Sequence, residues 1–260
     1  MRADKAMQQD VAVSFSVYTA LERPDLEDVG VPDVDVWPEY NLHGDVVNPY
    51  WGPLWKELPQ YQQFLVDDDS GSVLAELEAG PVWWDDTEAG LSSGVDESLI
   101  ASIEGHRLGR PVNTLCAFAA EIAVSAQGRG LAIEGVKAMR ELARAHGFGH
   151  LIAPVRPSFK YKYPEMPIDE YVSLTRPDGL SIDPWIRVHQ RLGGRIARTI
   201  PKSMRISGTV AEWETWTGIE FPRDGDFIFP EALAPLHVDH ARDLGVYYEP
   251  NVWIVHAVDP

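Results

Sequence analysis

Hydrophobic and polar positions along the chain separate its strands from its helices. Apolar and small polar residues alternate from Val11 to Val17, which predicts a strand. The run 113–124 is almost continuously apolar, as expected of a strand that is covered on both faces. Further strands are predicted at residues 61–66, 72–84, 150–155, 195–206, 236–238 and 252–258.

The best-defined helix covers residues 131–146. Its apolar stripe consists of Leu131, Val136, Met139, Leu142 and Ala143. Charged residues occupy the opposite side, and Gly147 ends the helix as a C-terminal cap. A second helix is predicted to begin at Asp183-Pro184, with Asp as its cap, and a third at the capping-box pair Thr209 and Glu212. Two more are predicted near residues 51–58 and 97–107.

A glycine-rich turn joins the strand 113–124 to the best-defined helix. Its sequence is Gln127-Gly128-Arg129-Gly130-Leu131-Ala132. The first N–H groups of a helix have no partner within the helix, and the helix dipole adds partial positive charge there. The two glycines also remove side chains that would keep a ligand from the backbone. This turn therefore predicts a site for an anion, typically a phosphate.

Composition narrows the class of protein. The chain has 260 residues, with 22 Lys and Arg against 40 Asp and Glu, a formal net charge of -18. Such a chain is repelled by nucleic acid and by anionic membranes, and no basic run offsets this. Cys116 is the single cysteine, so a disulfide within the chain is excluded, and its apolar strand predicts a buried thiol. With no spanning apolar run and no metal-ligand cluster, we expect one soluble, cytoplasmic domain over residues 1–260 without a metal.

The spacing Gln-x-x-Gly-x-Ala, at Gln127, Gly130 and Ala132, resembles the acyl-CoA pyrophosphate loop of the GCN5-related N-acetyltransferases. The resemblance implies an α/β (α+β) fold with a mixed, mainly antiparallel sheet flanked by helices. In that family the fourth and fifth strands, here 113–124 and 150–155, part to admit pantetheine. The resemblance covers about residues 11–206, with an insert at 156–179 and an extra segment at 207–260. One departure is the short stretch after Val124, which lacks the usual proline.

The resemblance also implies where the cofactor, acetyl-CoA or another short acyl-CoA, is held. The backbone N–H of Val124 is the candidate for holding the acyl carbonyl. The pyrophosphate is assigned to the loop residues Gln127, Gly128, Arg129, Gly130, Leu131 and Ala132.

Two side chains are candidates for the proton transfers that acyl transfer to an amine requires. Glu121 interrupts the apolar strand, so it must face a polar pocket, where it would act as the base, or have a buried ion-pair partner. His189 takes the place of a Tyr that protonates the leaving sulfur in the resembled family, and an imidazole can do so near neutral pH. It shares a helical face with Trp185 and Leu192, so a core histidine is the alternative.

A second resemblance concerns GNAT-like domains of polyketide-synthase loading modules. It rests on the helix sequence from Asp183 to His189, which matches Asp-Pro-x-x-Arg-x-His. In those domains an Arg on the following strand handles a malonyl carboxylate, a role that falls to Arg205 here. Those domains also use a hydroxyl residue near the fifth strand, and Ser158 is the only loose match to it here. An outward-facing position on the strand is the alternative for Arg205.

Together these patterns predict an acyl-CoA-dependent acyltransferase of secondary metabolism that acetylates an amine-bearing small molecule. Two alternatives stay open. One is a malonyl-thioester decarboxylase or S-acyltransferase, which would have a carrier protein as partner. The other is a catalytically inactive CoA-binding module. The oligomeric state and the acceptor are not readable from the sequence.

Overall fold

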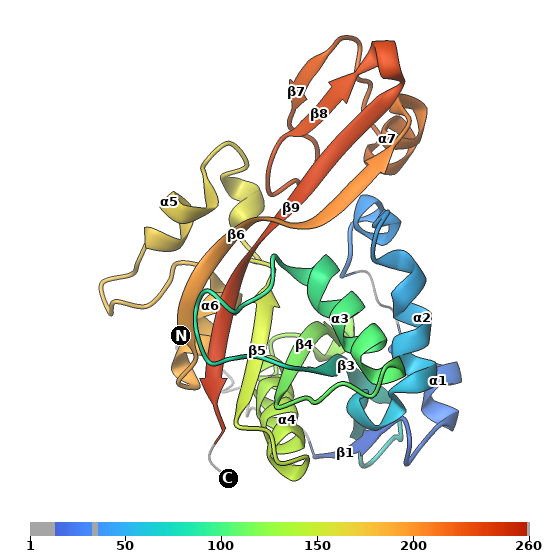
Figure 1. Cartoon of the computed structure of the whole chain (residues 1–260), viewed down its shortest axis with the longest axis vertical. Coiled ribbons are helices and arrows are strands. Elements are labelled where there is room, and N and C mark those ends of the chain that lie inside the picture. The colour runs from blue at the N-terminus through green and yellow to red at the C-terminus, as the bar shows by residue number, and fades with distance from the viewer. Residues whose placement is uncertain (1–13, 33–35, 259–260) are drawn as a thin grey trace, which may run out of the picture.

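The structure is a computed structural model that describes residues 14–32 and 36–258. Within these residues, nine strands form one sheet in the order β1-β2-β3-β4-β5-β9-β8-β7, with β6 also paired to β9 (Figure 1). The strands are β1 Phe15–Thr19, β2 Gln63–Asp67, β3 Val73–Val82, β4 Thr114–Ile122, β5 His150–Val155, β6 Arg195–Gly208, β7 Gly225–Phe227, β8 Leu236–Asp239 and β9 Leu244–Ala257. Only the β4–β5 pair is parallel, so the predicted mixed, mainly antiparallel sheet is confirmed. Residues 11–13 of the first predicted strand lie outside the described part.

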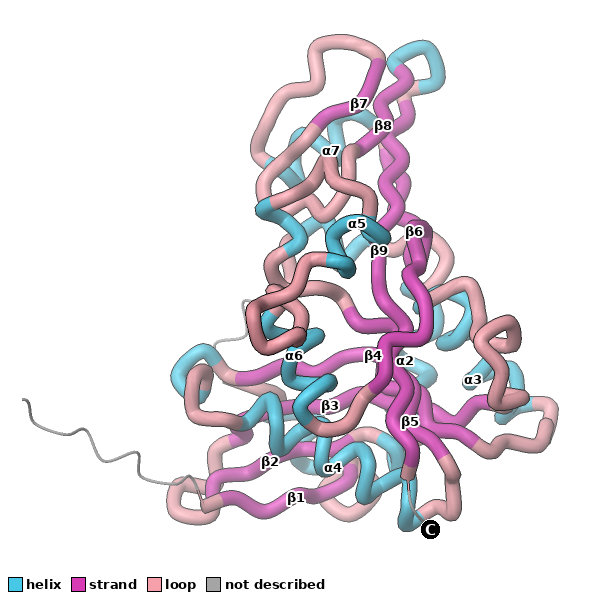
Figure 2. Tube along the Cα trace, turned by 90° about the vertical axis from the view of Figure 1, so that its left-hand side faces the viewer, coloured by secondary structure: helices cyan, strands magenta, loops and turns pink. Residues whose placement is uncertain are grey.

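Helices cover both faces of the sheet. They are α1 Asp25–Val29, α2 Asn48–Glu57, α3 Val95–Arg107, α4 Leu131–Ala145, α5 Ile168–Ser173, α6 Pro184–Arg191 and α7 Val210–Thr217. Figure 2 shows α4 and α6 on one face of the sheet and α2 and α3 on the other. Fully buried residues such as Leu77, Leu99 and Leu115 lie where these helices pack on the sheet.

The parallel pair β4–β5 is short, and the two strands then part. Pairing covers only Thr114–Cys116 of β4 and His150–Ile152 of β5, although both strands continue. On its other side β4 stays paired with β3, where a register shift between Glu78 and Ala79 marks a bulge. The splay predicted for the fourth and fifth strands is therefore present, and it opens the sheet at its centre.

The C-terminal segment completes the sheet rather than being an addition to it. Strand β9 pairs with β5 along the whole of β5 and also pairs with β6. The predicted limit of the core at residue 206 thus falls inside β6, within the long β6–β9 hairpin. Only the far end of this hairpin forms a separate lobe, with α7, β7 and β8 (Figure 1, top). The predicted strand 252–258 is only the second half of β9, which begins eight residues earlier, at Leu244.

Asp183 connects the 156–179 insert to α6. One carboxylate oxygen accepts hydrogen bonds from the N–H groups of Trp185 (3.0 Å) and Ile186 (3.1 Å), so the predicted cap is confirmed. The other accepts from the N–H of Phe159 (2.7 Å) and from the hydroxyl of Tyr171 (2.8 Å) on α5. Because Asp183 is fully buried, these four donors fix the insert against the helix that bears His189.

The segment that precedes α2 is anchored in the lobe by Tyr40. Its ring contacts those of Trp213 at 6.2 Å and Tyr247 at 5.4 Å between centroids, and it is buried. This anchor holds the neighbouring Trp37 and Asn41 against the open centre of the sheet.

Candidate active site

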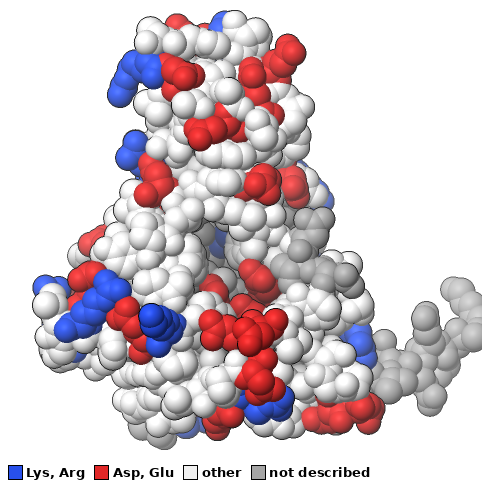
Figure 3. Space-filling model, turned by 90° about the vertical axis from the view of Figure 1, so that its right-hand side faces the viewer, with Lys and Arg blue, Asp and Glu red and all other residues white. Residues whose placement is uncertain are grey.

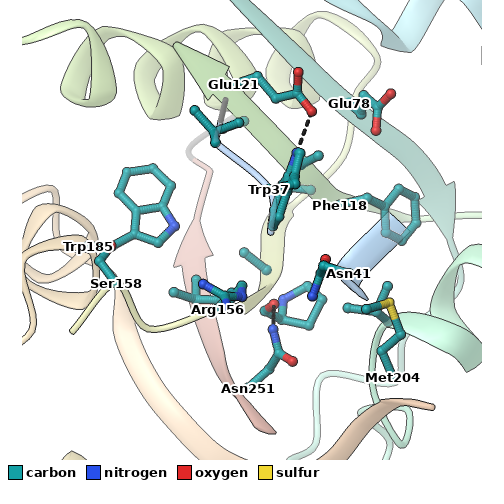
Figure 4. Close-up of a pocket in the computed structure, with 18 of the residues that line it drawn as sticks. Trp37, Asn41, Glu78, Phe118, Glu121, Arg156, Ser158, Trp185, Met204 and Asn251 are labelled. Carbon is teal, nitrogen blue, oxygen red and sulfur yellow. Dashed lines mark hydrogen bonds between the residues drawn. The ribbon is translucent and has the colours of Figure 1, made fainter. Parts of the chain in front are cut away.

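A cavity of about 530 Å³ occupies the gap between β4 and β5 (Figure 4). Residues 117–122 of β4 and 153–156 at the end of β5 form its walls. Gln127 and Ala132 line it at the glycine loop, and His189 lines it from α6. The cavity therefore connects the predicted phosphate site with both proton-transfer candidates.

The glycine loop has the geometry expected of an anion site. Gly128 and Gly130 have φ angles of 75° and 85°, in the left-handed region that favours glycine. A Cβ built on either glycine meets no atom within 4 Å, so the space above the loop is open to a ligand. Leu131 is buried and anchors the start of α4, which runs to Ala145 as predicted apart from one residue. The loop fits a pyrophosphate held by backbone N–H groups.

Val124 lies outside the strand in which it was predicted. Strand β4 ends at Ile122, and Val124 begins a single 3-10 turn, Val124–Ala126. The predicted strand was thus two residues too long at this end. Val124 is half exposed, and the cavity is lined by Ile122 instead. Its role in holding the acyl carbonyl stays a prediction.

Three glutamates lie together on β3 and β4, and two of them, Glu78 and Glu121, line the cavity. Glu76 and Glu121 are directly opposite each other in the strand register, and Glu78 is the next residue on the same face of β3. Trp37 donates its indole N–H to Glu121, and Trp55 donates to Glu78 at 2.6 Å. Among residues 14–32 and 36–258, none of the three glutamates has an ion-pair partner within 4.0 Å. The buried ion pair considered for Glu121 is therefore not formed with any residue that the structure describes.

Burial raises the pKa of each of these carboxyls. It raises the pKa of Glu78 to about 8, and nearby carboxylates add to the shift. Burial and the charge of Glu121 raise the pKa of Glu76 to about 7. The pKa of Glu121 is also raised by burial, although the hydrogen bond from Trp37 lowers it in part. Each carboxyl would ionise more readily with a cation beside it.

These raised values predict a pH-dependent stability. A carboxyl whose pKa is higher in the folded than in the unfolded protein stabilises the fold at low pH, and this contribution is lost as pH rises through the folded value. Between about pH 6 and pH 8 we expect the melting temperature of the ligand-free protein to fall, through the values of about 7 and 8 for Glu76 and Glu78. Calorimetry should show a smaller fall in Glu78→Gln, which cannot ionise. An identical pH slope in both proteins would contradict the assignment.

His189 is both buried and part of the cavity wall. It is 2% exposed, and its Nδ1 lies 2.9 Å from Nε2 of His256. The ring of Trp185 packs edge-on against it at 4.5 Å. Burial and the neighbouring His256 lower the pKa of His189 to about 3, so it is neutral near pH 7. Nε2, on the other side of the ring, has no hydrogen-bond partner among the described residues.

Arg205 does not line the cavity. Its neighbour Met204 does, whereas the Arg205 side chain is 42% exposed and pairs with Asp45 at 3.5 Å. Adjacent residues of a strand point to opposite faces, so the outward alternative is the one that the structure supports. The arginine inside the cavity is Arg156, which pairs with the buried Glu249 and donates to the hydroxyl of Tyr40 at 3.0 Å. Ser158 also lines the cavity.

Acidic side chains also characterise the surface around the site. Figure 3 shows a hollow in the face that carries α2, with acidic side chains gathered directly below it. Among the described residues, no group of three or more His, Cys, Asp or Glu side chains has an arrangement that could hold a metal ion. In the same residues no helix is long and apolar enough to cross a membrane.

No family model matches the chain, but a curated relative does. It is the arginine N-acetyltransferase avaD of Aspergillus versicolor, 31% identical over 276 residues that span 94% of each protein. The chain belongs to the GCN5-related N-acetyltransferase (GNAT) superfamily. The predicted acyl-CoA-dependent acyltransferase activity, with N-acetyl transfer to an amine, is confirmed with this membership.

Solved structures agree on the fold of this GNAT protein. The loading GNATL domain of CurA from Lyngbya majuscula has a TM-score of 0.54 and 16% identity, covering 94% of this chain and 98% of that domain. The GphF GNAT-like decarboxylase, solved in complex with isobutyryl-CoA, has a TM-score of 0.57 and 14% identity, covering 94% and 100%. At these identities the likeness shows the fold alone.

Proposed function

We propose that this protein transfers the acetyl group of acetyl-CoA to the primary amine of a small molecule, in the gap between β4 and β5. The observation that carries the proposal is the extent of the cavity. It begins beside the glycine loop at Gln127 and Ala132 and reaches Glu121 and His189. A donor held by the loop can thus present its acyl group to a carboxylate and an imidazole within one cavity.

The chain's own groups account for the steps of the reaction. Backbone N–H groups of residues 127–132 hold the pyrophosphate, and a β4-side N–H, assigned to Val124, polarises the acyl carbonyl. Glu121, ionised once a cationic amine lies beside it, accepts the proton that the amine must lose. The amine nitrogen then attacks the acyl carbon, and the carbon–sulfur bond breaks with its electron pair going to sulfur. The second proton of the nitrogen passes to this sulfur, so that the products are the amide and the free thiol of CoA.

His189 is suited to stabilise the departing sulfur as a neutral hydrogen-bond donor. When His256 donates to Nδ1 of His189, the hydrogen of the His189 ring is on Nε2, which has no partner in the described residues. With a pKa of about 3, the ring would not carry a second proton near neutral pH. We therefore assign it hydrogen bonding to the thiolate rather than proton transfer from an imidazolium.

The acidic cavity favours a cationic acceptor over an anionic one. Arginine, named in the relative from Aspergillus versicolor, is an amine of this kind and is the first acceptor to test. With a small-molecule acceptor of this kind, we also propose a role in secondary metabolism and a cytoplasmic location. A carrier-protein partner belongs to the decarboxylase alternative.

That alternative needs a fixed cation for the malonyl carboxylate. Arg205 lies outside the cavity, and the charge of Arg156 is already balanced by Glu249. With acetyl-CoA and arginine we expect acetylated product by mass and an equal amount of free thiol. With malonyl-CoA alone we expect no carbon dioxide, and Arg205→Leu should change neither result. Carbon dioxide release without an acceptor would favour the decarboxylase, whereas acetyl-CoA binding without turnover of any amine would favour the binding module.

A further inference from the structure

Glu78 and Glu121 at the cavity, with Glu76 beside them on β3, can provide more negative charge than amine deprotonation requires. One carboxylate, Glu121, is sufficient as the base. Glu78 also lines the cavity, and Glu76 lies directly opposite Glu121 in the strand register. Buried carboxylates are costly unless they are paired, and none of these three has an ion-pair partner in the described residues. The three carboxyls therefore lack a cation that a ligand can bring.

Two other side chains show independently that the cavity is built around a polar ligand. The Asn251 side chain is 3% exposed, and its N–H donates to the carbonyl of Pro154 at 2.8 Å. Its Oδ1, like Nε2 of His189, is buried without a partner in the described residues. Both residues line the same cavity as Glu78. Figure 4 shows Asn251 and Glu78 among the side chains of this cavity. Buried polar atoms are rarely left unpaired, so a bound molecule is expected to satisfy them.

The position of Glu78 relative to Glu121 sets the spacing between two charges. Glu78 pairs with Ala119, two residues before Glu121 on β4, so the two glutamates are diagonal neighbours. Diagonal positions are roughly 7–8 Å apart, a distance that a short aliphatic chain spans. Trp55 holds the Glu78 carboxyl from the α2 side, and Trp51 and Phe118 add aromatic surface to the cavity. Such surface suits the alkyl chain or guanidinium plane of a ligand.

We propose that Glu78 determines acceptor specificity by binding a second cationic group, so that the acceptors are small molecules with both a reacting amine and an ammonium or guanidinium group. The reacting amine lies at Glu121 and the second cation at Glu78. This inference rests on the proposed N-acetyl transfer and adds to it the acceptor class and the residue that selects it. Arginine has both groups, as do agmatine and 1,4-diaminobutane.

Ionisation of the cluster is consistent with such a ligand. Glu78 faces Glu76, Glu121 and the indole of Trp55. The charge of Glu27 on α1 also raises the pKa of Glu76. No basic side chain contributes to the shifts of Glu76 or Glu78, whose pKa values are raised by burial and like charge. A bound cation would lower them and release protons.

The test compares acceptors that differ in one charge. The pairs are 1,4-diaminobutane with butylamine and arginine with citrulline, each measured with acetyl-CoA. We expect the wild type to favour the doubly cationic member at least tenfold in kcat/KM. Glu78→Gln should abolish this preference mainly through KM, with kcat and the KM for acetyl-CoA nearly unchanged, and Glu78→Asp should restore part of it. Loss of equal size for both members of a pair, or no preference in the wild type, would overturn the proposal.

Two controls separate the possible failures. Glu141→Gln removes an exposed carboxylate of α4 and should behave as wild type. Circular dichroism and the melting temperature show whether Glu78→Gln folds, which we expect because Gln retains an acceptor for Trp55. If no amine is acetylated, the proposed function fails, and calorimetric titration of agmatine against butylamine still tests the subsite. Tenfold tighter agmatine binding that is lost in Glu78→Gln would support it, and equal binding would overturn it.

Discussion

Replacing Glu121 by Gln is expected to lower kcat by about 10²–10³, within the range typical of losing a general base. The carboxylate lies on the cavity wall at the point where β4 has left β5, and burial already raises its pKa toward the range of a useful base. Gln keeps the size of the side chain and an oxygen for the indole of Trp37. The KM for acetyl-CoA should therefore change little, as measured by steady-state release of free thiol.

The pH profile provides a second measurement of the same assignment. Since the basic form of Glu121 exists above its raised pKa, kcat/KM of the wild type should increase with pH through that value and then level off. Glu121→Gln should lack this increase. The matched control is Glu104→Gln, a carboxylate of α3 that pairs with Arg107 on the surface. Normal turnover by Glu121→Gln would assign the base elsewhere, with Glu78 the first candidate.

Local signals were sufficient to predict the cofactor side of the site. The glycine loop, the amphipathic helix after it and the Asp183 cap each depend on residues within one or two turns of chain. Their side-chain period and cap chemistry do not depend on distant partners. This is why the predicted bounds of α4 agree with the structure to within one residue.

Pairing over long sequence distances explains what the sequence did not show. Strand β9 joins β5 from about a hundred residues further along the chain, and no local pattern marks that contact. Likewise Trp37 and Trp55 reach the glutamates of β3 and β4 from separate segments. Glu76 and Glu78 have the alternation of a half-exposed strand, and only the arrangement of β3 beside β4 turns that polar face into a cavity wall.

Arg205 shows that a correctly predicted strand does not by itself determine which of its side chains face the cavity. The strand 195–206 was predicted and is present as β6, but side chains alternate between its two faces. In the register with β9, Met204 lies opposite Glu249 and Arg205 opposite Tyr248, which places Met204 at the cavity. Which face a residue takes depends on that register, which is a tertiary property. Arg156 was missed because it follows a strand at the start of an irregular segment.

Replacing Gly130 by Asp is expected to weaken acetyl-CoA binding at least tenfold, about 1.4 kcal/mol. The glycine is the cap of α4, has a φ of 85° and faces open space, where the Asp carboxylate would repel the pyrophosphate. Calorimetric titration with acetyl-CoA measures the loss directly. The loss of affinity should also raise the KM for acetyl-CoA. The kcat at saturating acetyl-CoA should change much less, because Gly130 takes no part in the proton transfer assigned to Glu121.

Two variants separate charge from backbone strain in that result. Gly130→Asn keeps the size of Asp and tolerates the left-handed conformation, but has no charge, so its affinity loss should be clearly smaller. Gly109→Asp places the same residue at another glycine with positive φ, 60°, and open surroundings, on a turn that does not line the cavity. It should bind acetyl-CoA as the wild type does. Equal losses in Gly130→Asp and Gly130→Asn would mean that loop conformation, not charge, sets the affinity, and unchanged binding in folded Gly130→Asp would place the pyrophosphate away from the loop.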